Sequence, residues 1–141
     1  MIEDWNEEPA ISAHAMNADQ FSDRLWDAAV RVSKVADALP DTRTGRHVAG
    51  QLIRCGTSSA PNYDEACAAE SRADFAHKVS IANKEMRETC GWLGFIIKRG
   101  LQSERQIAPL LDERRQLLKM LSSSVLTAKT RPPQSPILNP Q

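Results

Sequence analysis

Apolar residues recur along most of the chain at alternating steps of four and three positions. The first such series begins at Phe21 and ends at Leu39. This spacing places the apolar side chains on one face of an α-helix. Pro40 and Gly45 follow, and we expect the helix to end there, because proline cannot continue a helix and glycine supports a turn.

A second series starts near Arg46 and continues, with smaller and more polar members, to Ala66. Pro61 lies inside it. Because proline has no amide hydrogen and its ring crowds the carbonyl of Thr57, we expect a kink in the second helix.

Two further series predict two longer helices. The third helix starts after Ser71, which can cap it, and ends at Gly100, while the fourth starts at about Ser103. Pro109 is expected in the first turn of the fourth helix, or just before a slightly later start. Four amphipathic helices with short connections pack most simply as antiparallel neighbours. The predicted fold is therefore all-α, an antiparallel up-down four-helix bundle over residues 18–130.

The two ends of the chain lack this periodicity. Residues 1–17 hold four acidic residues, and residues 131–141 hold four prolines. We expect a disordered acidic arm and a disordered proline-rich tail.

Composition narrows the class of protein. Aromatic residues make up 5% of the chain, and no apolar run approaches the roughly 20 residues that cross a bilayer. The N-terminal residues lack the basic start and the apolar segment of a signal peptide. The three cysteines form no C-x-x-C pair, which argues against a disulfide framework or a zinc site. We therefore expect a cytoplasmic protein without membrane contact, metal or cofactor.

The formal charge is zero overall but unevenly distributed, with an acidic segment at residues 1–28 and a basic one at residues 98–131. The basic segment is a candidate for contacts with nucleic-acid phosphates. Alternatively, Asp19, Asp23 and Asp27 of the first helix face the basic end of the fourth helix and neutralise it. The candidate nucleic-acid contacts are Lys98, Arg99, Arg105, Arg114, Arg115 and Lys119.

The third helix carries a second stripe, about a quarter turn from its core stripe, which needs a partner of its own. Its members are Ile81, Glu85, Glu88, Trp92 and Phe95. Either the second helix or a neighbouring subunit can cover this stripe. We expect Ile81, Trp92 and Phe95 to form an oligomer interface.

The glutamates of this stripe have a candidate partner on the second helix. Pairing the two helices about their loop places Arg54 within reach of Glu85 and Glu88. Together with Asn62, which can satisfy backbone groups freed at the kink, we interpret them as a structural polar cluster. Such a pair fixes register more than it stabilises, because desolvation offsets most of the attraction. The alternative, an acid/base or metal site on the paired glutamates, needs a pocket that the sequence does not indicate.

Asp74-x-x-His77 invites comparison with di-iron bundles, which use Glu-x-x-His twice together with two further glutamates. This chain has a single copy with aspartate, and its first helix contains no glutamate. It has neither a glycine-rich phosphate loop nor a serine–histidine motif. We therefore expect a protein that is not an enzyme.

Three segments carry a family resemblance. They are Gly50–Ala66 (GQLIRCGTSSAPNYDEA), Ser71–Phe75 (SRADF) and Lys84–Leu93 (KEMRETCGWL). In this order they resemble the four helix bundle protein family, also called the 23S rRNA-intervening sequence proteins, which includes the accessory subunit of diversity-generating retroelements. The resemblance implies an antiparallel four-helix bundle assembled as a ring-like homopentamer. For the retroelement branch it also implies a basic surface that binds a reverse transcriptase and nucleic acid.

Three functions are compatible with these features. We favour a non-catalytic oligomeric scaffold or adapter whose main partner is itself. The alternative is a nucleic-acid-binding accessory subunit of a reverse transcriptase-type complex, which would bind nucleic acid or a protein partner weakly. The third is a metal-dependent bundle enzyme.

Overall fold

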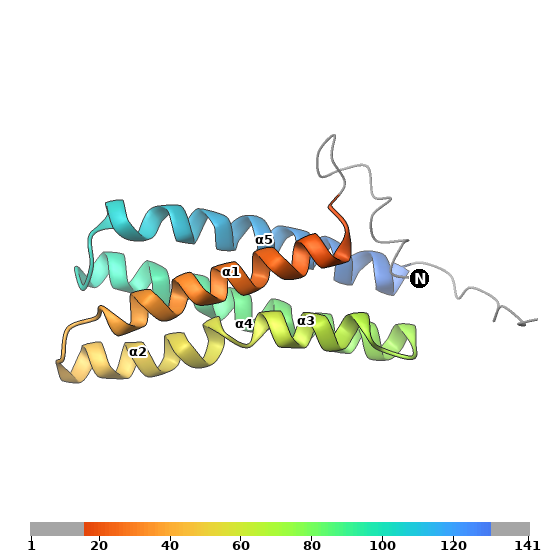
Figure 1. Ribbon diagram of the computed structural model, residues 1–141, viewed down its shortest axis with the longest axis horizontal. Coiled ribbons are helices and arrows are strands. Elements are labelled where there is room, and N and C mark those ends of the chain that lie inside the picture. Colours follow the sequence, from red (N-terminus) through yellow and green to blue (C-terminus); the bar gives the residue numbers. More distant parts are fainter. Residues whose placement is uncertain (1–15, 131–141) are drawn as a thin grey trace, which may run out of the picture.

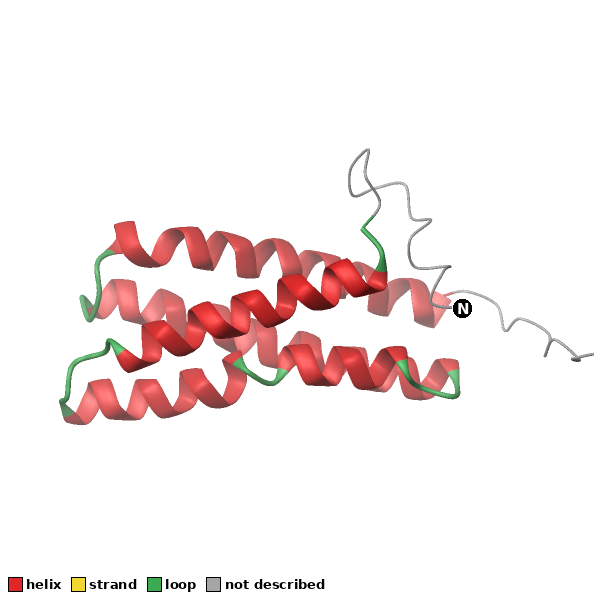
Figure 2. Ribbon diagram, viewed as in Figure 1, coloured by secondary structure: helices red, strands yellow, loops and turns green. Residues whose placement is uncertain are grey.

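The computed structural model describes residues 16–130, which are helical throughout apart from their connections (Figure 2). The expected arm and tail fall largely on residues 1–15 and 131–141, which lie outside the described residues. Within the described part there are five α-helices and no strand. The helices are α1 (Ala18–Asp37), α2 (Arg43–Gly56), α3 (Ser59–Cys67), α4 (Arg72–Arg99) and α5 (Glu104–Thr130).

Helices α2 and α3 follow each other end to end, so the chain forms four helical stretches that lie side by side (Figure 1). The connections from α1 to α2 and from α4 to α5 lie at one end of the molecule, and the connection from α3 to α4 lies at the other. The expected kink is present between α2 and α3. Pro61 lies in the first turn of α3, where its missing amide hydrogen costs little.

Side-chain caps define where the helices begin. In α1, the amide of Gln20 donates to Asn17 Oδ1 (2.8 Å) and the amide of Asn17 donates to Gln20 Oε1 (3.0 Å), which completes a capping box. Thr42 Oγ1 accepts a hydrogen bond from the amide of Gly45 (3.0 Å). This cap explains why α2 begins at Arg43, earlier than the expected start near Arg46.

Gly100 and Pro109 lie on either side of the connection between α4 and α5, and they affect the helices differently. Gly100 caps α4 in the left-handed conformation, with φ of 73°. Pro109, by contrast, lies inside α5 and neither in its first turn nor before it. Ile107 and Leu110, on either side of the exposed proline, are buried. Their packing holds the helix through the position despite the lost hydrogen bond.

The core consists of two apolar clusters that meet at the level of the α2–α3 break. One cluster contains Phe21, Leu25, Tyr63, Val79, Met86, Leu117 and Leu121 among its buried members. The other contains Val32, Val48, Leu52, Leu93, Ile96, Ile107, Leu110 and Leu111. Met16 packs against the first cluster and Asn17 caps α1, so these two residues belong to the folded part of the chain.

Candidate functional site

Three polar side chains are buried where the two apolar clusters meet. Ser59, Thr89 and Arg114 have no exposed surface, and each comes from a different helix. The Ser59 hydroxyl donates to the carbonyl of Ala82 (3.2 Å), and the Thr89 hydroxyl donates to the carbonyl of Glu85 (2.8 Å). These two residues are satisfied in the usual way for buried hydroxyls.

Arg114 is a buried cation that forms no ion pair with a carboxylate of the described residues. Its Nη2 donates to the carbonyl of Gly56 (2.6 Å), and Nη1 lies 3.2 Å from Met86 Sδ. Its Nε has no hydrogen-bond partner among the described residues. Burial lowers the pKa of Arg114 from its ordinary value to about 10, because desolvation penalises the charged form. The charges of Cys90, Cys55 and Glu113 have smaller effects, which raise this pKa.

Gly56 provides the acceptor for this guanidinium because α2 ends there. A Cβ atom on Gly56 would lie 2.3 Å from Val32 Cγ1, so α1 and α2 approach each other closely at this point. In a continuous helix the Gly56 carbonyl would accept from the amide of Ala60. The break before α3 leaves the carbonyl to Arg114, which thereby ties α5 to the kink.

The expectation that Arg114 contacts nucleic acid is therefore wrong, since a fully buried guanidinium reaches no phosphate. A sequence signal for its burial was present. Arg114 continues the core stripe of α5, which runs through Ile107, Leu110, Leu117 and Leu121 at steps of three and four. The charge of the side chain hid a position that the spacing assigned to the core.

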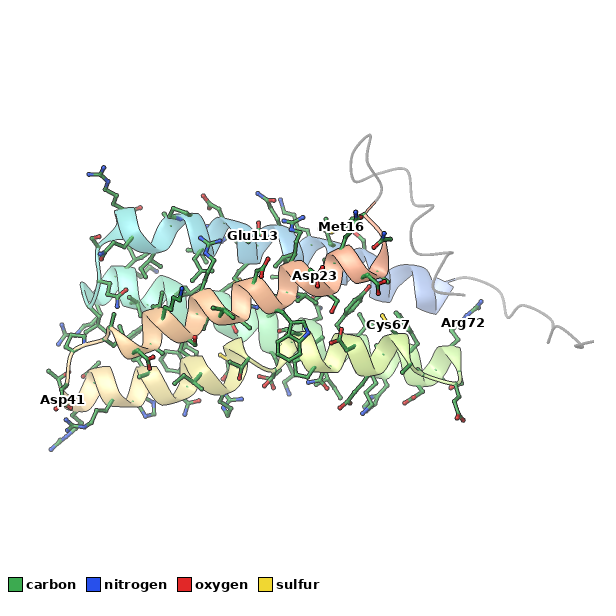
Figure 3. The ribbon with its side chains drawn as sticks, in the orientation of Figure 1. Met16, Asp23, Asp41, Cys67, Arg72 and Glu113 are labelled. Atoms are coloured by element: carbon green, nitrogen blue, oxygen red, sulfur yellow. The ribbon has the colours of Figure 1, made fainter. Side chains whose placement is uncertain are left out.

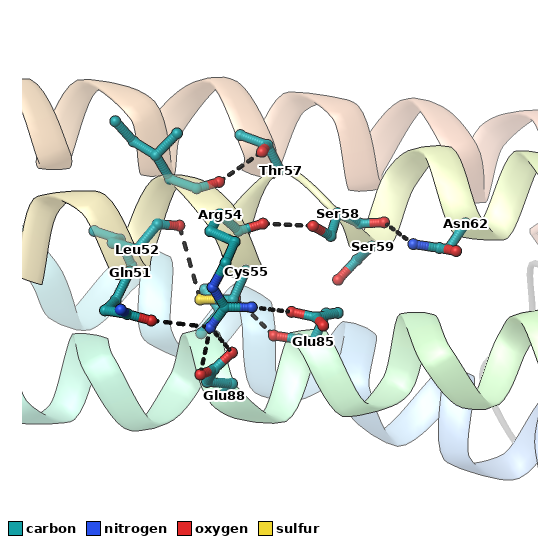
Figure 4. A network of polar contacts seen from close by, with 12 residues as sticks. Gln51, Leu52, Arg54, Cys55, Thr57, Ser58, Ser59, Asn62, Glu85 and Glu88 are labelled. Carbon is teal, nitrogen blue, oxygen red and sulfur yellow. Dashed lines mark hydrogen bonds and ion pairs between the residues drawn. The ribbon is translucent and has the colours of Figure 1, made fainter.

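A second polar cluster lies at the surface between α2 and α4 (Figure 4). Arg54 Nη2 lies 2.6 Å from both carboxylate oxygens of Glu88, and Nη1 lies 3.3 Å from Glu85 Oε2. Gln51 Oε1 also accepts from Nη2 (3.0 Å). The hydrogen bond to Glu88 is the main reason why the pKa of Arg54 is raised. The structure thus brings Arg54, Glu85 and Glu88 together, as α2 and α4 lie side by side.

Asn62 lies apart from this cluster and serves the kink. Its Nδ2 donates to the carbonyl of Ser58 (2.8 Å), while the Ser58 hydroxyl donates to the carbonyl of Arg54 (Figure 4). The Thr57 hydroxyl donates to the carbonyl of Ile53 (2.6 Å). Side chains therefore occupy backbone carbonyls around the point where the regular helix is interrupted.

The geometry of the surface cluster favours structure over chemistry. The Arg54 guanidinium lies against both glutamates, in the position that an attacking water or a metal ion would need. Asp74 and His77 are exposed on α4. Across residues 16–130, no group of three or more His, Cys, Asp and Glu side chains is placed to hold a metal ion.

Three aromatic rings, those of His47 on α2 and of Trp92 and Phe95 on α4, form a ladder of edge-to-face contacts. The ring centroids of His47 and Trp92 are 5.9 Å apart, and those of Trp92 and Phe95 are 5.6 Å apart. Trp92 also packs against the core and is only partly exposed, as is Ile81, whereas Phe95 is 39% exposed. Of the three residues expected at an oligomer interface, Phe95 is therefore the one that the bundle itself leaves open.

The other candidate nucleic-acid contacts are at the surface. Lys98 and Arg99 end α4, Arg105 lies in the first turn of α5, and Arg115 and Lys119 lie further along α5. All five are exposed.

The contact between α1 and α5 has the opposite polarity to the expected one. Arg24 on α1 forms a bidentate ion pair with Glu113 on α5, which is labelled in Figure 3. Arg24 Nε donates to Glu113 Oε1 (3.0 Å) and Nη2 donates to Oε2 (2.8 Å). Among the bases of α5 whose side chains are described, which end before residue 125, none forms an ion pair with Asp19, Asp23 or Asp27.

None of the helices in the described part is long and apolar enough to cross a membrane. Together, the fold and the two polar clusters define a small all-helical bundle. No curated protein matches the chain.

The chain belongs to the 23S rRNA-intervening sequence protein family, whose profile matches residues 21–123. Among solved structures, it is similar to a protein of unknown function from the S23 ribosomal protein family of Bacteroides thetaiotaomicron. The two sequences are 31% identical, and the match covers 79% of this chain and 99% of the other with a TM-score of 0.72. The family resemblance stated from the three sequence segments is thereby confirmed.

Proposed function

We propose that this protein is a non-catalytic scaffold or adapter that acts by self-assembly. In this proposal the subunit is an antiparallel up-down bundle, and the assembly is a homopentamer in the cytoplasm. The observation that carries the proposal is the ladder of His47, Trp92 and Phe95, because an exposed aromatic residue at the end of an ordered ring cluster is typical of an interface anchor. The arrangement of the polar groups adds support, since the described carboxylates of the candidate site are occupied by Arg54.

The first test is the mass of the protein in solution. We expect sedimentation equilibrium at micromolar concentration to give a mass several times the 15.6 kDa of one chain. Phe95→Glu should dissociate the assembly, because it places a charge in an apolar contact without disturbing the core. The exposed residue Gln116 on α5 provides a matched control, and Gln116→Glu should leave the mass unchanged. A wild-type mass of one chain would refute self-assembly.

The five exposed basic residues favour a second candidate, an accessory subunit that binds nucleic acid. Lys98, Arg99 and Arg105 flank the short connection between α4 and α5, so their charges gather at one end of the bundle. Assembly would repeat this charge on every subunit, and weak attraction per subunit would add through multivalency.

The expected binding is weak, nonspecific and dependent on salt. Fluorescence anisotropy with structured RNA and duplex DNA should show affinity that falls by roughly 10²–10³-fold between 50 and 200 mM salt if one subunit's five bases contact phosphates. Arg99→Ala/Arg105→Ala should weaken binding, whereas Arg114→Met should not, since Arg114 is buried. Tight binding at physiological salt with a clear sequence preference would contradict this expectation.

A further inference from the structure

The N-terminal half of the outer face of α1 is acidic around an apolar centre, and the exposed bases Arg31 and Lys34 follow it along the helix. Asp23, Trp26, Asp27 and Val30 recur at helical spacing, and all four are exposed. Trp26 is 43% exposed and Val30 is 52% exposed, which makes them two of the large apolar residues that the described bundle leaves uncovered. Among the described residues, neither aspartate forms an ion pair. Asp23 is labelled on this helix in Figure 3.

Trp26 is held in place although it is exposed. Its Nε1 donates to Asp64 Oδ2 of α3 (2.8 Å), and the Ser22 hydroxyl donates to the other carboxylate oxygen of Asp64. The polar end of the indole is thus satisfied within the chain, and the rest of the ring is left for an apolar contact. A ring fixed in this way loses little conformational freedom on binding, which is a property of interface anchors.

The outer face of α4 has the opposite charge. Lys84, Arg87, Gly91 and Phe95 are exposed, at steps of three and four along the helix. A Cβ atom on Gly91 would meet nothing within 4 Å, so packing within the subunit does not require this glycine. A helix with glycine at an interior position is less stable than the same helix with alanine there. An exposed glycine flanked by two bases and a phenylalanine leaves room for a large ring from another chain.

The two faces lie at opposite corners of the bundle. Helices α1 and α4 each pack on α2, α3 and α5. Figure 1 shows α1 at the front of the bundle and α4 behind it. Like charges would meet if Asp23 and Asp27 lay against the same residues of a second copy, and likewise if Lys84 met Lys84 of a second copy. Each face fits the other in charge and shape, with the large Trp26 on one side and the open Gly91 on the other.

We propose that the α1 face of one copy docks on the α4 face of the next, with Trp26 seated over Gly91 beside Phe95. This inference rests on the proposed self-assembly and specifies its geometry. Two different faces of one subunit meet, so the contact is heterologous and repeats from copy to copy around a ring.

The test uses charge reversal on each face. Asp23→Lys/Asp27→Lys alters only the α1 face, and Lys84→Glu/Arg87→Glu alters only the α4 face. We expect each double variant to raise the dissociation constant of the assembly by about tenfold or more, since like charges then face each other. The quadruple variant reverses both faces and should restore the dissociation constant to within about threefold of wild type, because complementarity returns. Arg115→Glu/Lys119→Glu on α5 is the matched control and should leave assembly unchanged.

The outcomes separate this inference from the proposed function. Circular dichroism and thermal melting establish that each variant is folded before its mass is measured. A wild-type chain that is monomeric defeats both proposals. If wild type assembles and Phe95→Glu dissociates it, but the α1 variant assembles as well as wild type, then self-assembly stands and the α1 face is excluded. Failure of the quadruple variant to recover, with both double variants dissociated, also overturns the proposed pairing of the two faces.

Discussion

Replacing Gly56 by alanine is expected to lower the free energy of unfolding by about 2–3 kcal/mol. The added Cβ would lie 2.3 Å from Val32 Cγ1, and Val32 is fully buried. A β-branched side chain in a packed core cannot move aside at little cost, so the backbone of α2 must shift instead. That shift also displaces the carbonyl that accepts the hydrogen bond from Arg114.

The same substitution at Gly50, earlier in α2, should change the free energy of unfolding in the opposite direction. A Cβ atom on Gly50 would meet nothing within 4 Å, and Gly50 lies inside α2. We expect Gly50→Ala to raise the free energy of unfolding by about 0.5–1 kcal/mol through helix propensity alone. Urea unfolding of both variants checks the pair, with the subunit concentration held equal because assembly shifts apparent stability. Equal effects at both positions would show that α1 and α2 do not meet closely at Gly56.

Much of the fold was accessible from the sequence because its determinants are local. The apolar spacing assigned the helices, and Pro61 predicted the interruption between α2 and α3. The deviations have local causes as well. The Thr42 cap moved the start of α2, and packing on both sides of Pro109 carried α5 through a residue that usually ends a helix.

The candidate site was less accessible, since it depends on which helices come together. The pairing of Arg54 with Glu85 and Glu88 could be inferred from the register of two helices joined by one loop. The burial of Arg114 depends on three separate helices and on a carbonyl freed by the kink. Residue type suggested a surface cation, and only the arrangement of the whole bundle places it in the core.

Arg114 gives the second large expected effect, which is a gain of stability on replacement by methionine. The pKa of about 10 implies that burial of the charge costs about 3 kcal/mol at neutral pH. Methionine has a similar length and no charge to desolvate. The substitution also leaves the Gly56 carbonyl without its hydrogen-bond donor, and this loss offsets about 1–2 kcal/mol of the stability gained. We therefore expect Arg114→Met to raise the free energy of unfolding by about 1–2 kcal/mol.

Alanine at the same position should have the opposite effect. Arg114→Ala removes the same buried charge and leaves the same orphaned carbonyl, but it also leaves a cavity that costs about 2–5 kcal/mol relative to methionine, so we expect a net loss of about 2 kcal/mol. Urea unfolding at pH 7 distinguishes the two variants. If methionine destabilises the chain as much as alanine does, the hydrogen bond to Gly56 outweighs the cost of burying the charge, and Arg114 is a net stabilising residue.

The pH dependence tests the same cost independently. The folded chain releases the Arg114 proton near pH 10 and the unfolded chain at a higher pH, so between these two pH values the unfolded chain binds more protons. In this pH range the free energy of unfolding therefore rises with pH, because the free-energy cost of burying the charged form of Arg114 decreases. Most other groups that titrate in this range are common to wild type and Arg114→Met, while the thiols of Cys90 and Cys55 interact with Arg114 and belong to the same titration. The stability advantage of Arg114→Met should therefore be constant from pH 7 to 9 and shrink above pH 10. An advantage that stays constant to pH 11 would show that the pKa of Arg114 is not lowered.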